Sequence, residues 1–171
     1  MLIHTNTFAE ANSNTTPRRI ETYRGVVHGC DCDLMGHLNT VRYAAIFDSA
    51  TWTMLRHLGY RWTREAQAGW ADIRNVFEYK QEIPVDAVIF VESNISRLGK
   101  TSLTLHHELQ YEDALHPGGA ARGEVVLVRF DLRERRPDPH PDDFRLAVLP
   151  FIAHSNGPQA SGASRNGDNI S

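Results

Sequence analysis

The sequence predicts an α+β domain in which a curved antiparallel β-sheet wraps around one long central helix. Two observations lead to this fold class. Residues 41–58 contain neither Pro nor Gly, and their apolar side chains recur at spacings of three and four, which is the period of an α-helix. From residue 71 onward, apolar and polar side chains alternate in segments separated by turn residues, as in strands joined by hairpins.

The predicted helix at 41–58 carries apolar side chains on most of its surface. Trp52 and Leu55 broaden the stripe that begins at Tyr43, and a helix that is apolar on nearly every side is expected to be buried. Solvent-facing loops cannot bury it, so a sheet must wrap around it. A single wrapped sheet leaves its edge strands unpaired, which predicts a homodimer or a dimer of dimers.

The strands follow in order along the chain. One is expected before the helix, at residues 20–28, where Tyr23 and two valines favour β structure. Four more are expected after it, at 71–83, 87–97, 101–111 and 121–133. Pro84 ends the first of these four, and a Leu-Gly-Lys run forms a hairpin turn between the next two. Residues 144–152 could add a short strand or pack on the surface.

The two ends of the chain differ in composition from this segment. Residues 1–19 are polar and rich in Asn and Thr, and residues 153–171 are rich in Ser and Gly with few apolar side chains. Such segments cannot bury enough apolar surface to fold. We therefore expect a flexible N-terminal arm at 1–19, one domain at 20–152 and a disordered C-terminal tail at 153–171.

The composition also limits the partners and the compartment. The chain has 171 residues and a net charge of −3, so no general attraction to nucleic acid or to an anionic membrane is expected. Its two cysteines, Cys30 and Cys32, lie too close in sequence for an easy disulfide. The N-terminus lacks a signal-peptide pattern, and no apolar run reaches the length of a membrane span. We interpret the chain as a reduced, cytoplasmic protein.

The loop before the helix concentrates groups suited to chemistry on a carbonyl. It holds the carboxylate of Asp33, the imidazole of His37 and the amide of Asn39. A carboxylate can attack a carbonyl or activate water, and the backbone N–H groups near Gly36 and Leu38 could stabilise an oxyanion at the helix N-terminus. Simpler roles also fit these residue types: Asp33 and Asn39 can be caps, and His37 can be a hydrogen-bonded buried histidine.

The run Asp-Cys-Asp-Leu-Met-Gly-His-Leu-Asn, with the helix and hairpin strands that follow, resembles the hotdog-fold acyl-CoA thioesterases. More narrowly, it is similar to the 4-hydroxybenzoyl-CoA thioesterase superfamily. The family has one essential carboxylate in this loop, which matches Asp33, whereas Asp31 falls where relatives vary. His37 and Asn39 match the family's Gly-His-x-Asn. The resemblance implies a hotdog fold, an acyl-CoA substrate and a catalytic set of Asp33, His37 and Asn39.

Coenzyme A is anionic, so its phosphates need local donors. Arg97, Lys100 and Ser102, around the predicted hairpin turn, are candidates by charge and by likeness to the family, although a solvated turn also accounts for each of them. Cys30 and Cys32 are not followed by a second ligand pair at metal-binding spacing. No phosphate-cradling glycine loop occurs either, so neither a metal nor a cofactor is expected.

Three functions stay open on the sequence alone. The first is thioester hydrolysis, with Asp33 as nucleophile or general base. The second is hydration of an enoyl-CoA, whose hotdog enzymes carry a different Asp–His spacing and usually a Pro that Leu34-Met35 does not match. The third is a non-catalytic hotdog module that binds acyl ligands. Asp48, in the middle of the helix, could be a second carboxylate of a dimer-related site or a hydrogen-bonded buried group.

Overall fold

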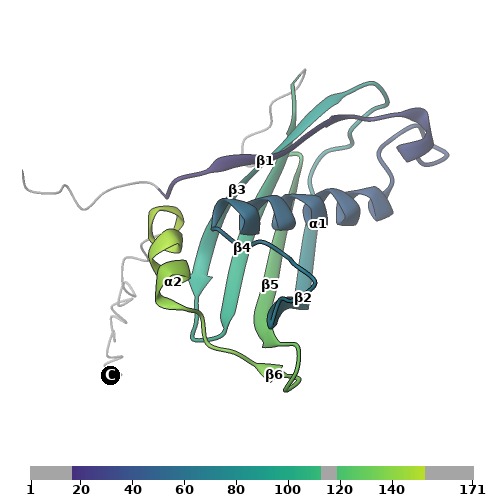
Figure 1. Cartoon of the computed structure of the whole chain (residues 1–171). Helices are drawn as coiled ribbons and strands as arrows, with labels where there is room; N and C mark the ends of the chain where they lie inside the picture. The colour runs from purple at the N-terminus through teal and green to yellow at the C-terminus, as the bar shows by residue number, and fades with distance from the viewer. Residues whose placement is uncertain (1–16, 113–118, 153–171) are drawn as a thin grey trace, which may run out of the picture.

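A computed structural model describes residues 17–112 and 119–152. The expectations for most of the N-terminal arm and for the C-terminal tail lie outside these residues. The described strands form one antiparallel sheet in the order β1-β3-β4-β5-β2, with the short β6 paired to β5. The long helix α1 lies across one face of this sheet (Figure 1), which confirms the predicted α+β class.

The long helix and the five long strands occur where the sequence pattern places them, with ends shifted by a few residues, whereas the four shorter elements were not predicted. In chain order they are β1 (Ile20–Val26), the 3-10 helix η1 (Gly29–Asp31), α1 (Thr40–His57), β2 (Ala68–Tyr79), β3 (Val88–Leu98), β4 (Ser102–Tyr111), β5 (Ala121–Asp131), β6 (Arg136–Pro137), α2 (Asp142–Val148) and η2 (Leu149–Phe151). The loop with the candidate residues thus joins β1 to the start of α1.

Helix α1 turns one face to the sheet and leaves the other open. Phe47 is fully buried, and its ring lies so close to Gly123 of β5 that a Cβ there would come within 3.1 Å of it. On the opposite face, Val41 is 73% exposed and Trp52 is 41% exposed. The expectation that the helix is buried on nearly every side is therefore wrong for the single chain, because the sheet covers only one face.

Strand β2 forms an open edge of the sheet. It pairs with β5 on one side only among the described strands, and Ile73 and Val76 in its middle are exposed. Unpaired edges with apolar side chains are sites where another strand can add. The open edge expected from the sequence is present, next to the uncovered face of α1.

Residues 144–152 form neither a strand nor a surface segment. They belong to α2 and η2, and Phe144, Val148 and Phe151 are buried against the end of the core. The spacing of these three side chains, four and then three, is helical, and Asp142 and Asp143 favour a helix start. This helical spacing covers only about two turns and follows a Pro-rich stretch, so the helix was not predicted.

A chain of buried polar groups ties α1 to the sheet. The Ser93 hydroxyl lies 2.6 Å from Thr22 Oγ1 and 2.6 Å from His107 Nδ1, and His107 Nε2 lies 3.0 Å from Thr51 Oγ1 on α1. Burial, with a smaller contribution from His106, lowers the pKa of His107 to about 3. The imidazole is therefore neutral at ordinary pH, when one ring nitrogen donates and the other accepts.

Candidate active site

Asp33 is held in one orientation by the backbone around it. Its Oδ1 accepts the N–H groups of Met35 at 2.8 Å and His37 at 3.3 Å, and its own N–H donates to the His37 carbonyl at 2.8 Å. Gly36 completes this tight loop with a φ of 85°, a conformation that favours glycine. Among the described residues, none donates a hydrogen bond to Asp33 Oδ2, so that oxygen is available to a ligand.

Asp33 lines an open pocket of about 310 Å³, which we call the Asp33 pocket. The loop, the first turn of α1 and the end of β2 enclose it. Besides Asp33, its walls include His37, Thr40, Tyr43 and Tyr79. Two of the three side chains that the resemblance assigns to catalysis therefore meet in one pocket.

Tyr43 has a double role that the sequence did not indicate. It is only 4% exposed, as expected for a core side chain, yet it also lines the Asp33 pocket and packs edge-to-face on Tyr79 with ring centroids 4.9 Å apart. Burial raises the pKa of Tyr43 to about 12, and the charge of Asp33 acts in the same direction. Its hydroxyl therefore stays neutral in this pocket.

His37 has one ring nitrogen near an acid and one without a partner. Nε2 lies 3.5 Å from Glu82 Oε2. The buried Nδ1 has no hydrogen-bond partner among the residues that the structure describes. Buried polar atoms normally have partners, so Nδ1 is an exception among the described residues of this loop.

Asn39 caps helix α1. Its Oδ1 accepts the N–H of Val41 at 3.0 Å, and its carbonyl accepts the N–H of Arg42 at 2.8 Å. The amide therefore performs the simpler of its two predicted roles. The preceding helical N–H, that of Thr40, has no acceptor within the described parts of the chain, and Thr40 lines the Asp33 pocket.

The backbone donors expected for an oxyanion are engaged elsewhere. The Gly36 N–H donates to the Asp33 carbonyl at 3.1 Å, and the Leu38 N–H donates to Ile83 at 2.8 Å. Among the described residues of this pocket, Thr40 at the start of α1 has a backbone N–H without an acceptor and is the candidate donor in their place. An Asn cap in the sequence is the signal that could have identified it, because the first N–H groups of a helix have no partner within the helix.

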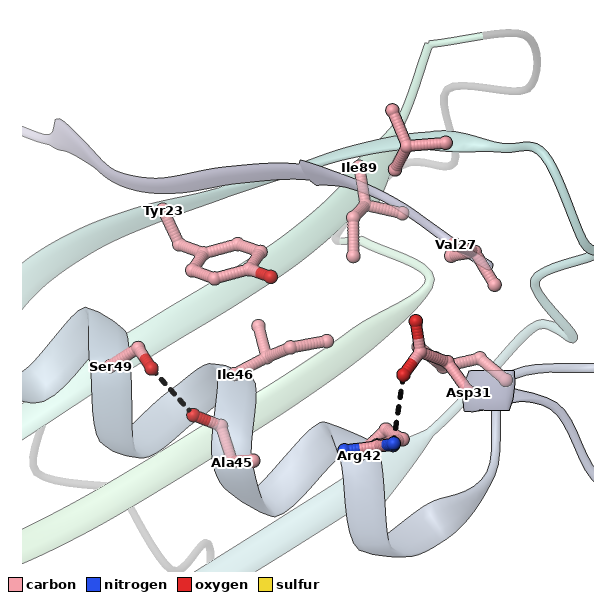
Figure 2. A pocket seen from close by; sticks show the side chains of 10 residues that line it. Tyr23, Val27, Asp31, Arg42, Ala45, Ile46, Ser49 and Ile89 are labelled. Carbon is pink, nitrogen blue, oxygen red and sulfur yellow. Dashed lines mark hydrogen bonds and ion pairs between the residues drawn. The ribbon is translucent and has the colours of Figure 1, made fainter. Parts of the chain in front are cut away.

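Asp31 lies on the other flank of α1. Its Oδ1 is 2.9 Å from Arg42 Nε, and its Oδ2 accepts the N–H of His28 at 3.2 Å. It lines a second pocket of about 130 Å³ between β1 and α1, which we call the Asp31 pocket (Figure 2). At 100° per residue, Arg42 points away from α1 nearly opposite to Thr40, so the two pockets flank the start of the helix.

The coenzyme A candidates lie at the opposite end of the sheet. Arg97, Lys100 and Ser102 surround the β3–β4 turn, whereas the Asp33 pocket adjoins the start of β3 and the end of β2. Strands of this length span about 30 Å. Within one chain the structure therefore does not bring these three residues to Asp33. Asp48 is exposed on α1, so it is not a buried charge in the single chain.

The described residues offer neither a metal-binding cluster nor a membrane-spanning helix. Within residues 17–112 and 119–152, no group of three or more His, Cys, Asp or Glu side chains could hold a metal ion. None of the helices in the same described ranges has the length and apolar character needed to cross a membrane.

The antiparallel sheet packed on one long helix, with an acidic loop at the helix start, defines a hotdog fold of the thioesterase type. Residues 27–148 match the model of the Thioesterase-like superfamily, and the chain belongs to that superfamily. No curated protein matches the chain significantly.

Solved structures agree with this fold. A predicted thioesterase from Bacillus stearothermophilus is 21% identical, with a TM-score of 0.70 over 80% of this chain and 98% of its own. A Staphylococcus aureus protein in complex with CoA is 18% identical, with a TM-score of 0.67 over 94% and 99%. A 1,4-dihydroxy-2-naphthoyl-CoA thioesterase from Synechocystis is 14% identical, with a TM-score of 0.66 over 77% and 96%. These likenesses show the fold.

Proposed function

We propose that this protein is a cytoplasmic acyl-CoA thioesterase in which Asp33 is the nucleophile or the general base. One observation carries the proposal: Asp33, whose Oδ2 accepts no hydrogen bond from the described residues, lines the same pocket as Thr40, the first residue of α1. A base or nucleophile beside an oxyanion donor is the minimum that thioester hydrolysis needs.

The pocket supports a simple course of reaction. The thioester oxygen accepts the N–H of Thr40, where the positive end of the α1 dipole stabilises the developing negative charge. Asp33 either attacks the carbonyl carbon, forming an anhydride that water then opens, or takes a proton from the attacking water. The C–S bond breaks as the anhydride forms in the first route and as the acid forms in the second. The departing CoA thiolate takes its proton from solvent in the first route and from the Asp33 carboxyl group in the second. His37, in the wall of the same pocket, would orient the thioester, and Asn39 would position Thr40 by capping the helix.

The similar structures support a CoA ester as the substrate class. One of them was solved in complex with CoA, and another is described as a 1,4-dihydroxy-2-naphthoyl-CoA thioesterase. The rival hydratase reaction lacks such support, because neither of these two structures is described as a hydratase.

A second copy of the chain would complete the site. If two β2 edges pair antiparallel about a two-fold axis, the β3–β4 turn of one copy approaches the Asp33 end of the other. Arg97, Lys100 and Ser102 of one chain would then bind the phosphates of the CoA held at the other chain's Asp33. The exposed Ile73 and Trp52 would be covered in the same step. We expect a homodimer or a dimer of dimers.

The activity is tested by incubating the purified protein with a panel of acyl-CoA esters and a thiol reagent. We expect release of free CoA from at least one ester. Loss of enoyl absorbance without thiol release would indicate the hydratase, and tight binding without either signal would indicate the binding module.

The shared site is tested by mixing two variants under conditions that exchange subunits. Asp33→Asn removes the carboxylate, and a double Arg97→Glu, Lys100→Glu change repels the phosphates. Each variant alone should be nearly inactive, but the hybrid dimer contains one intact site and should regain activity. An active monomer in light scattering, or no recovery on mixing, would contradict the shared site.

A further inference from the structure

One residue lines both of the pockets that flank α1. Leu38 is the residue common to the linings of the Asp33 pocket and the Asp31 pocket within the described chain. It is 5% exposed and belongs to the core. Leu38 is therefore the part of the wall that the Asp33 pocket and the Asp31 pocket have in common.

The Asp31 pocket has both polar and apolar side chains in its wall, and most of the apolar ones belong to the core. Val27, Ile46 and Ile89 are all nearly inaccessible to solvent, and Figure 2 shows them around the space between β1 and α1. The volume is about 130 Å³. A cavity of about 150 Å³ is known to hold benzene in another protein, so this pocket has room for a chain of several carbons.

Three polar side chains at the rim of this pocket, those of Asp31, Arg42 and Ser49, already have partners within the protein. Asp31 and Arg42 pair with each other, and Arg42 Nη2 also donates to the Cys30 carbonyl at 3.5 Å. The Ser49 hydroxyl donates to the Ala45 carbonyl at 2.9 Å. Because Asp31, Arg42 and Ser49 already have partners, an apolar occupant leaves none of these three unsatisfied. Tyr23 adds one further polar group to the wall of the pocket.

We propose that the Asp31 pocket is a subsite for the end of an aliphatic acyl chain and that Leu38, as the partition, limits the length of the acyl group. This inference rests on the proposed thioesterase function. Short acyl groups end at Leu38, and longer ones enter the Asp31 pocket only when that side chain turns aside or is removed.

The backbone around Leu38 is well held, so its side chain can be shortened without releasing the loop. The Leu38 N–H donates to Ile83 at 2.8 Å, and the next N–H, that of Asn39, donates to the Asp31 carbonyl at 2.9 Å. Leu38 also forms a β-bridge with Cys32. Truncation should therefore join the two pockets while Asp33 and Thr40 keep their positions.

The test compares wild type and Leu38→Ala on two series of increasing chain length. Non-hydrolysable alkyl-CoA thioethers give Kd values by calorimetry, and the matching acyl-CoA esters give kcat/KM. In Leu38→Ala, affinity and kcat/KM should rise by about fourfold for each further methylene that enters the joined pocket. Leu38→Met, which keeps the side-chain volume, should retain the wild-type length preference. If Leu38→Ala does not fold, Leu38→Val is measured instead and should show a smaller shift.

Two further variants separate an opened partition from a loosened core. Leu105→Ala removes a fully buried leucine of β4 that lines neither pocket, and it should leave the length preference unchanged. Ala45→Phe, on the helix wall of the Asp31 pocket, should fill the pocket and cancel the gain in the Leu38→Ala background.

The outcomes distinguish this inference from the proposed function. If the protein hydrolyses acyl-CoA but neither series shifts in Leu38→Ala, or if Leu105→Ala shifts equally, the partition is refuted and the thioesterase stands. If no ester is hydrolysed but the thioethers show the shift, the activity is refuted and the subsite stands. If no thioether binds at all, both are refuted.

Discussion

Asp31 and Asp33 are two residues apart in the sequence, yet they lie on opposite flanks of α1 and have different partners. Asp31 pairs with the guanidinium of Arg42, whereas Asp33 is held by backbone N–H groups alone. The turn of η1 and the tight loop at Gly36 separate their directions. A carboxylate paired with a cation serves the structure, whereas one held by neutral donors with one oxygen free can still react.

The largest effect should come from Asp33→Asn. The amide keeps the size of the side chain and can still accept the loop hydrogen bonds, but it can neither attack a thioester usefully nor take a proton from water. The catalytic rate should fall by about 10²–10⁴-fold, while binding of an alkyl-CoA thioether should survive. Steady-state rates on the best acyl-CoA ester, with folding checked by circular dichroism, measure this.

Asp31→Asn is the matched control for this comparison. It should alter the rate far less, because the carboxylate faces Arg42 rather than the Asp33 pocket. Near-normal turnover in Asp33→Asn together with a loss in Asp31→Asn would reverse the assignment of the two residues. Near-normal turnover in both variants would refute a carboxylate mechanism.

A smaller effect, on the free energy of unfolding, should follow from the buried His107. Its pKa is lowered from 6.5 to about 3 in the folded protein. Between these two pH values, His107 binds a proton in the unfolded chain but stays neutral in the folded chain. Stability from this group is present above pH 6.5 and is lost as the pH falls below it. The expected loss is about 2 kcal/mol at pH 5 relative to pH 8.

Denaturant titrations across this pH range test the His107 effect. His107→Gln can keep hydrogen bonds to Ser93 and Thr51 but does not titrate. The variant should be less stable at pH 8, and its stability should change less between pH 8 and pH 5. Parallel pH curves for the variant and the wild type would show that His107 is not the titrating group.

The smallest expected effect concerns Asn39, the N-cap of α1. Asn39→Ala removes the acceptor for the Val41 N–H and should cost about 1 kcal/mol in the free energy of unfolding. Asn39→Asp keeps the cap and should retain most of that stability. If the Ala variant instead lost activity a hundredfold at unchanged stability, the amide would have a direct catalytic role.

The sequence predicted the elements well because their patterns are local. The period of residues 41–58 and the alternation after residue 71 depend only on near neighbours, and both gave correct elements. Asp33 was chosen over Asp31 by resemblance, and the structure places these two side chains in different pockets. The choice itself is still a prediction.

Other features depend on contacts that no local pattern carries. The apolar stripe of α1 does not show which of its side chains face the sheet and which stay uncovered in the single chain. Trp52 was therefore assigned to the interior, although it is 41% exposed. The Asp31 pocket exists because β1 crosses near α1, and residues 23 and 49 meet there only after folding. The engagement of the Leu38 N–H by Ile83 is likewise a contact between distant segments.

The close contact of Phe47 with Gly123 means that the position of α1 on the sheet affects both the Asp33 pocket and the Asp31 pocket. The missing methyl group on β5 fixes how deeply the helix sits on the sheet. A Cβ at Gly123 would lie 3.1 Å from the Phe47 ring, so the ring or the helix that carries it would have to shift, and both pockets border that helix. Changes in the sheet beneath α1 therefore cannot adjust the reacting end and the tail end of a substrate independently. Independent adjustment has to come from side chains that line one pocket alone.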